Sequence, residues 1–193
     1  MMLRPRLLLP PVLALLLAAC AGGQQLQKAG DANAFDMQLV STLDWSRIKR
    51  PRFEAWTIDG TDLNLLRIYS GVRANEHVFQ TVRQKNSRPD GPWFKPTMRP
   101  DEIRDVVLDA LREEGAANVA GGDLRPHRFG GTDGLRFDFT MTSANGLDYR
   151  GTAAAAVRNG TLTLLLWYAP AEYYYDRDVA AVSRMLDDMT FVQ

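Results

Sequence analysis

The only cysteine of the 193-residue chain, Cys20, lies at the end of an apolar N-terminal run and directly follows Leu17–Ala19. A thiolate is a strong nucleophile, so this sulfur is the first candidate for covalent chemistry. The run has the order of a secretory leader, because Arg4 and Arg6 precede an apolar stretch that ends in two small residues. The apolar stretch is shorter than the roughly 20 residues that a permanent membrane helix needs. The pattern therefore predicts a secretory leader that is cut after its small residues, close to Cys20.

This arrangement resembles a bacterial lipobox, in which diacylglycerol is joined to the cysteine thiol before the leader is removed. The resemblance implies that residues 1–19 are a lipoprotein signal peptide, that Cys20 is lipidated, and that the membrane is a partner through this N-terminal lipid. No aspartate follows Cys20, which by the same resemblance favours the outer membrane, facing the periplasm, over the inner membrane. The alternative is an ordinary signal peptide cut after a small residue, with Cys20 a bystander.

No other group of residues has the spacing of a catalytic, cofactor or metal site. His77 and His127 are the only histidines, and they lack the spacing of transition-metal ligands. No serine lies in a G-x-S-x-G turn. The glycine-rich stretch 130–134 precedes a predicted strand rather than a helix, which disfavours phosphate binding. We therefore predict no cofactor and no enzyme, although a hydrolase could use carboxylates such as Asp138 and Glu172.

Three groups of residues could instead form an interaction surface. They are the basic cluster Arg47, Lys49, Arg50 and Arg52, the loop aromatics Trp93 and Phe94, and the run Tyr173, Tyr174 and Tyr175. The basic cluster could touch lipid headgroups or an acidic partner, although such runs are more often a solvated edge. Three adjacent tyrosines cannot all point into one core, so at least one is expected at the surface, unless they close one end of a sheet. The loop aromatics could form a contact finger or fold back as a lid on the core.

Charge and length narrow the function classes. The chain has 23 basic and 23 acidic residues, and the leader holds two arginines and no acid, so the mature chain carries 21 − 23 = −2. This balance argues against nucleic-acid binding and gives no broad attraction to anionic lipid. The mature length of 193 − 19 = 174 residues suits one domain.

Turn signals and hydrophobic periodicity predict the elements that position these residues. Residues 20–36 read as a lipidated, flexible tether because they are rich in Gly, Gln, Ala and Asn, and residues 37–193 read as one domain. Turn dipeptides and apolar alternation predict a hairpin of residues 53–58 and 63–72 and a meander of strands near 135–142, 147–157 and 161–168. Periodicity predicts helices over residues 100–115 and 176–189, short strands at 37–40 and 190–192, and a long loop at 80–99. The resulting fold class is α+β, with a mostly antiparallel sheet of about six strands covered by helices.

Four segments carry a further resemblance: Met98–Ile103, Phe129–Gly131, Gly134–Phe139 and Gly146–Gly151. They resemble the helix start and hairpins of small bacterial lipoproteins and periplasmic proteins with a Mog1/PsbP-like α/β/α sandwich. The resemblance implies helices on both sides of the sheet and a binding or assembly role rather than catalysis. We therefore expect a lipid-anchored cell-envelope module that binds an envelope protein. Two alternatives stay open: the carboxylate hydrolase, and a carrier that holds a small apolar ligand between sheet and helix.

Overall fold

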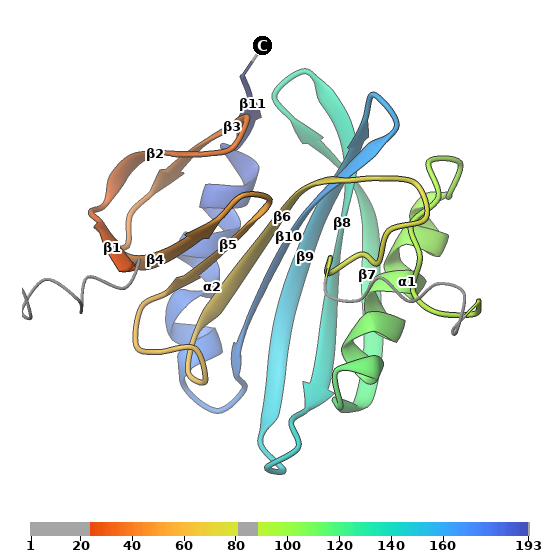
Figure 1. The fold of residues 1–193 in the computed structure, drawn as a ribbon. Coiled ribbons are helices and arrows are strands. Elements are labelled where there is room, and N and C mark those ends of the chain that lie inside the picture. The colour runs from red at the N-terminus through yellow and green to blue at the C-terminus, as the bar shows by residue number, and fades with distance from the viewer. Residues whose placement is uncertain (1–23, 81–88, 193) are drawn as a thin grey trace, which may run out of the picture.

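The computed structural model describes residues 24–80 and 89–192, so Cys20 and the predicted leader lie outside it. Within these residues, eight strands form one sheet in which all neighbouring strands are antiparallel. In spatial order the strands are β1 (Gln24–Gln27), β4 (Trp45–Arg50), β5 (Phe53–Thr57), β6 (Leu65–Val72), β10 (Thr161–Pro170), β9 (Asp148–Arg158), β8 (Thr132–Thr142) and β7 (Ala117–Phe129). Figure 1 shows that this sheet forms the centre of the domain.

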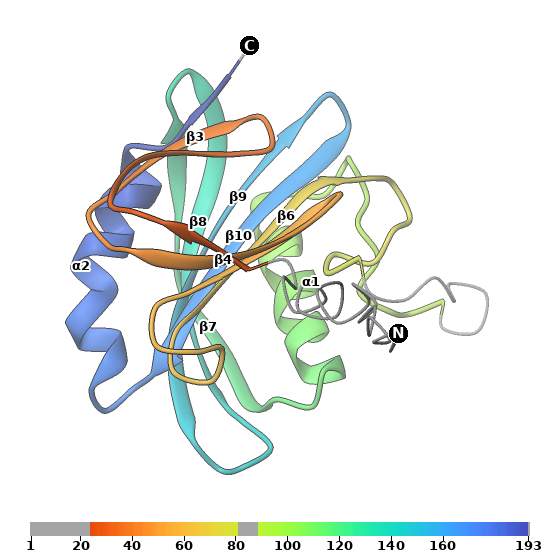
Figure 2. The same ribbon diagram turned by 60° about the vertical axis from the view of Figure 1, so that its left-hand side comes forward.

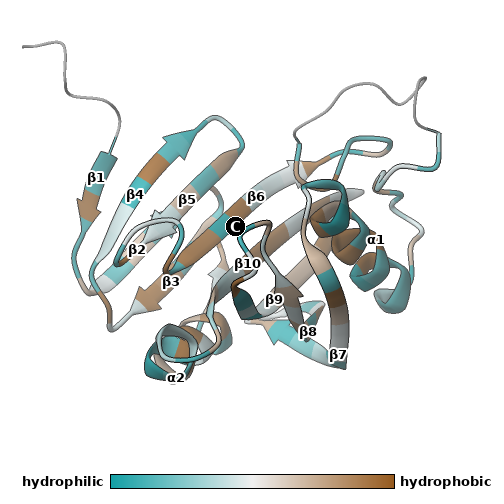
Figure 3. Cartoon of the chain, turned by 90° about the horizontal axis from the view of Figure 1, so that it is seen from below, coloured by the Kyte–Doolittle hydropathy of each residue, from teal (hydrophilic) through white to brown (hydrophobic). Residues whose placement is uncertain are grey.

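A smaller sheet and two helices cover the large sheet. The small sheet has the order β11 (Thr190–Phe191), β3 (Met37–Ser41), β2 (Gly30–Ala34). The helices are α1 (Pro100–Glu113) and α2 (Tyr174–Asp187). The view from below shows them on opposite faces of the large sheet (Figure 3), and the small sheet lies next to α2 (Figure 2). Neither helix of the described residues is long and apolar enough to cross a membrane.

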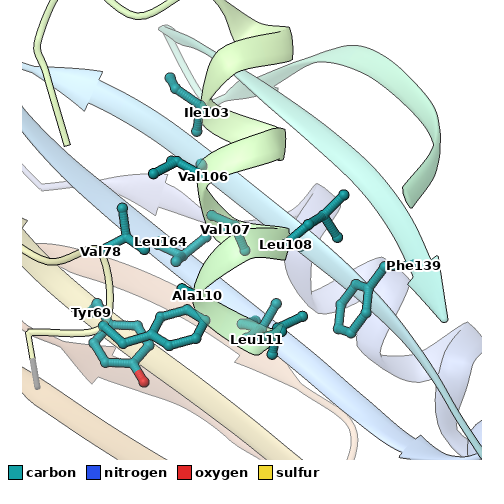
Figure 4. Packing of buried hydrophobic residues seen from close by; sticks show 14 of the residues in the cluster. Tyr69, Val78, Ile103, Val106, Val107, Leu108, Ala110, Leu111, Phe139 and Leu164 are labelled. Carbon is teal, nitrogen blue, oxygen red and sulfur yellow. The ribbon is translucent and has the colours of Figure 1, made fainter. Parts of the chain in front are cut away.

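Helix α1 packs on one face of the sheet through a stripe of apolar side chains. Val107, Ala110 and Leu111 are buried against strand residues that include Phe139 and Leu164 (Figure 4). The helix begins at a proline, and the carboxylate of the third helical residue accepts a hydrogen bond from the main-chain N–H just before the helix. Both features stabilise a helix start. The position of α1 is therefore determined both by its local sequence and by its packing on the sheet.

Helix α2 and the small sheet cover the other face. Val182, Met185 and Leu186 of α2 are buried in a second apolar cluster with Trp45 and Trp167 of the large sheet. Strand β10 supplies both clusters, because alternate side chains of a strand point to opposite faces. The sheet is therefore the middle layer of an α/β/α arrangement.

The expected hairpin, meander, both helices and last strand are confirmed within one or two residues at each end, apart from β8, which begins three residues earlier, at Thr132. Two expectations were wrong. The large sheet has eight strands rather than about six, because residues 24–27, 45–50 and 117–129 also pair into it, whereas the expected strand at 37–40 belongs to the small sheet. Residues 24–34 are not a flexible tether, because β1 pairs with β4 and β2 pairs with β3. Pairing with β4 and β3 outweighs the weak strand preference of their Gln, Gly and Asn residues.

Candidate binding surface

Four connections meet at one end of the large sheet, which we call the loop end. They are residues 58–64 between β5 and β6, 114–116 after α1, 143–147 between β8 and β9, and 171–173 between β10 and α2. The main-chain N–H of Ala171 donates a 2.9 Å hydrogen bond to the carbonyl of Asp148, the first residue of β9, which joins the connection after β10 to the end of the β8–β9 hairpin. The loop end lies at the bottom of Figure 1. Loops grouped in this way are where binding residues most often lie on a rigid scaffold.

The loop end contains a cavity of about 210 Å³ between the end of α1 and the sheet. Leu111 and Met141 give it apolar walls, and Arg67, Glu114 and Tyr168 give it polar ones. This volume is below the roughly 300–1,000 Å³ of typical small-molecule pockets. The cavity is therefore better matched to one large side chain of a partner than to an extended ligand.

An ion pair and aromatic rings define the chemistry of this cavity. Arg67 Nη1 lies 2.6 Å from Glu114 Oε2, and its guanidinium lies 5.4 Å from the ring centre of Tyr168. Burial opposes the charge of Arg67, but the oxygen atoms of Tyr168, Tyr69 and Glu114 raise its pKa overall. Burial also raises the pKa of Tyr168. At physiological pH the cavity thus presents a charged guanidinium beside protonated phenols, which suits hydrogen bonding and aromatic contact.

The sequence reasoning missed the cavity residues. Arg67 and Tyr168 lie inside strands that read as apolar core, and Glu114 lies at the end of a helix. One signal was present, because Arg67 is a charged residue in the otherwise largely apolar strand β6. A charge at such a position needs a partner, and that partner comes from a distant helix end.

The three predicted tyrosines are divided between surface and core. Tyr173 is 62% exposed, and its ring meets that of Tyr174 edge to face at 5.1 Å. Arg177 lies under both rings, 5.7 Å and 5.1 Å from their centres. Tyr175 is instead buried and stacks on Trp167. Only the first two tyrosines can belong to an interaction surface.

A second exposed apolar side chain lies at the same end. Leu147 is 40% exposed in the connection between β8 and β9, the connection that also supplies Ser143 to the cavity wall. Tyr173 lies in the neighbouring connection that is hydrogen-bonded through Ala171. The loop end therefore combines a cavity with exposed apolar groups.

The predicted basic cluster is not one surface. Arg47 is buried and holds Glu54 through its Nε and Nη2 atoms at 3.1 Å and 2.8 Å. Arg52 pairs with Glu76 at 2.5 Å. Lys49 and Arg50 are exposed at the end of β4. Arg47 and Lys49 lie on the same face of β4, and Arg47 alone is covered, because its guanidinium also donates to Gln27 Oε1 and to the carbonyl of Asn33.

The predicted loop aromatics also lie inside the molecule. Trp93 is 5% exposed and Phe94 is fully buried. The main-chain N–H of Phe94 donates to the carbonyl of Glu76, and Trp93 packs edge to face with His77. These contacts rule out a contact finger at this position and place the two rings as a lid on the core beside α1.

The carboxylates suggested for hydrolysis lie in unsuitable surroundings. Asp138 faces the guanidinium of Arg125 across β7 and β8, at 3.2 Å. Glu172 is exposed in the connection between β10 and α2. A general acid instead needs burial that keeps its proton at neutral pH. The described residues contain no group of three or more His, Cys, Asp or Glu that could hold a metal ion.

No protein-family model matches the chain, and no curated protein sequence matches it. Cyanobacterial PsbP from Synechocystis is similar in structure, with 8% identity over 90% of this chain and 95% of that protein and a TM-score of 0.51. A protein from Bacteroides thetaiotaomicron is 9% identical, over 86% of this chain and 50% of that one, with a TM-score of 0.46. LpqN of Mycobacterium tuberculosis, involved in cell envelope biogenesis, is 12% identical over 91% and 87%, with a TM-score of 0.38. The first likeness shows that the fold is PsbP-like, which the sequence predicted, and it shows the fold alone.

Proposed function

We propose that this protein is a lipid-anchored binding module of the cell envelope, held by Cys20 in the outer membrane, whose loop end binds an envelope protein in the periplasm. The observation that carries the binding role is the exposed Tyr173 and Leu147 beside a cavity of about 210 Å³. The anchor is supported by the placement of the single cysteine after a leader-like run. The two supports are independent, so each has its own test.

The composition of the loop end suits protein recognition. Aromatic residues and arginine dominate the binding energy of protein interfaces, most often around a pocket that takes a side chain of the partner. Tyr173, Tyr174 and Arg177 provide such residues on one side, and Arg67 lines the cavity itself. Arg177 is fixed in place by ion pairs with Asp178 and Asp59. A fixed side chain loses less entropy on binding, which favours affinity.

The loop end is also well placed for an anchored protein. The described chain begins at Gln24, which is paired with Ile48 close to the turn between β4 and β5. Strand β5 runs from that turn to residue 57 at the loop end. The anchored end and the loop end are therefore at opposite ends of the strands, which leaves the loop end accessible to a partner.

Photocrosslinking in intact cells tests the partner. A photoreactive phenylalanine analogue at position 173 or 147 should give the same crosslinked envelope protein. The matched control is Arg184, an exposed position on α2 away from the loop end, which should not give that product. Absence of a crosslink from both loop-end positions, or an identical pattern from position 184, would overturn the binding role.

Membrane fractionation tests the anchor separately. The intact mass of the mature protein should show an N-terminal Cys20 carrying acyl groups. A Cys20→Ala variant should move from the outer-membrane fraction to the soluble fraction. An unmodified Cys20 in the mature protein would remove the anchor and leave the loop-end result unaffected.

The carrier of a small apolar ligand is the weaker alternative. The cavity lies between a helix and the sheet, as a carrier requires, but its walls include the Arg67–Glu114 ion pair. An apolar ligand would bury these charges without compensation, which is costly. Native mass spectrometry should therefore find the protein without a bound small molecule.

A further inference from the structure

The position of the first described residue limits how far the domain can stand from its anchor. Gln24 begins β1 and pairs with Ile48, one residue before Lys49. Four residue steps separate Cys20 from Gln24 in the sequence. Whatever path these residues take, they span at most about 14 Å, at up to about 3.6 Å per residue. This reach is far shorter than that of the tether expected from composition.

The end of the domain beside Gln24 is positively charged. Lys49 and Arg50 are exposed, and neither forms an ion pair within the described residues. Arg52 lies in the turn that follows Arg50, and it pairs with Glu76 of the connection after β6. Arg73 of that connection is exposed. The four basic side chains of this end and the carboxylate of Glu76 give it a net charge of 4 − 1 = +3. This local charge contrasts with the −2 of the whole mature chain.

We infer that the turn between β4 and β5, together with Lys49 and Arg50 at the end of β4, lies against anionic phospholipid headgroups of the leaflet that holds the anchor. The inference rests on the proposed function, because the lipid on Cys20 brings the turn to the surface. Electrostatic attraction to a membrane acts over about a Debye length, near 8 Å at physiological salt. The segment from Cys20 to Gln24 spans at most about 14 Å, and the long side chains of Lys49 and Arg50 reach further toward the surface. These charges can therefore come within a Debye length of the headgroups.

Headgroup contact would also fix the orientation of the domain. A lipid anchor alone leaves the domain free to tilt about Cys20. Each basic residue near an anionic surface shifts the equilibrium toward contact by about fivefold. Lys49 and Arg50 together would therefore hold this end of the sheet down and the loop end away from the bilayer.

Amine footprinting of the lipidated, full mature protein tests this inference. The protein is placed in vesicles of phosphatidylcholine alone or of phosphatidylcholine with phosphatidylglycerol, and reacted with an acetylating reagent. Acetylation of Lys49 should be slowed about fivefold or more by the anionic lipid. Lys28, whose side chain is 72% exposed beyond the other end of β1, serves as the internal reference and should be little affected. High salt should restore the reactivity of Lys49.

Charge-reversed variants complete the test. Arg50→Glu keeps Lys49 as the reporter and should remove its protection on anionic vesicles. Arg184→Glu makes the same charge change on α2 and should leave the protection intact. Equal reactivity of Lys49 in both vesicle types, or equal slowing of Lys28, would overturn the inference while lipidation stands. An unmodified Cys20 in the intact mass would overturn the anchor and this inference together.

Discussion

At the scale of single residues, a charged side chain of this protein can be buried where the strand register brings it an oppositely charged partner. Arg47 faces inward from β4, where Glu54 of β5 is its diagonal neighbour on the same face. Glu54 Oε2 also accepts a 2.7 Å hydrogen bond from Trp56 Nε1, and Arg47 donates a 2.7 Å bond to the carbonyl of Asn33. Each polar atom of the cluster is thus satisfied, which is the condition for burying charge. A run of basic residues in the sequence cannot show which of them has such a buried partner.

Glu54→Gln is expected to destabilise the fold strongly. The substitution keeps the shape but leaves the buried guanidinium of Arg47 without a counter-charge, which costs about 3–5 kcal/mol. Denaturant unfolding measures the change in free energy. Arg128→Ala, which breaks the exposed pair with Asp133, is the control and should cost less than about 1 kcal/mol. Equal losses for the two variants would contradict the role of burial.

Glu76 is expected to make stability depend on acidity. Its hydrogen bond from Arg52, with help from the main-chain N–H of Arg73, lowers the pKa of its carboxyl from 4.5 to about 2. A lowered pKa in the folded state stabilises the fold above the unfolded pKa of 4.5, and the gain is lost as the pH falls towards 2. The pair is about one-third exposed, so solvent keeps the effect below about 1 kcal/mol.

Glu76→Gln tests this dependence. The variant should be less stable than the original protein near neutral pH, and the difference should shrink as the pH falls from about 5 to about 2. Thermal unfolding across this range measures it. A difference that is constant with pH would show that the carboxylate charge does not contribute.

At the scale of elements, the sequence predicts those that local signals define. The helix at 100–115 and the meander hairpins have a capped start, turn dipeptides and regular alternation, and all are present. Strand β7 has no clear alternation in the sequence because Gly121 and Gly122 interrupt it, and one of these glycines has a packing role. A Cβ at Gly121 would lie 2.6 Å from a methyl carbon of Leu108, so the glycine lets α1 approach the strand. Register shifts near residues 117–120 and 122–125 further disturb its alternation.

The central strand β10 gives the sharpest test of the layered arrangement. Leu164 and Leu165 are consecutive, both at most 1% exposed, and they belong to the two different apolar clusters. Leu164→Ala and Leu165→Ala should each cost about 2–5 kcal/mol, because each leaves a cavity in a packed core. Denaturant unfolding would show it. Val40→Ala, at a position that is 42% exposed, should change stability by about 0.5 kcal/mol or less. A large loss at only one of the two leucines would show that one face of β10 is open.

At the scale of the whole molecule, antiparallel pairing places the basic turn and the loop end at opposite ends of the large sheet. Strands β4, β5 and β6 have the basic turn and the neighbouring Gln24, the first described residue, at one end, and the loop end at the other. The sequence named the tyrosines and the basic run as candidates, but it could not show that they lie at opposite ends. That separation depends on the strand order, which joins residues more than 100 positions apart in the sequence.

The distance of each end from the membrane can be measured directly. The chain has one cysteine, Cys20, so in the lipidated protein an introduced cysteine is the only free thiol. Ala74→Cys labels the connection after β6, and Glu172→Cys labels the loop end, both at exposed positions. The eight residues of β6 separate the two ends by about 26 Å, at about 3.3 Å per residue. Energy transfer from a dye on the thiol to acceptor lipids should therefore be stronger from position 74 than from position 172. Equal transfer would mean that the domain tumbles freely about its anchor, and stronger transfer from position 172 would mean that the loop end faces the bilayer and is blocked from a partner.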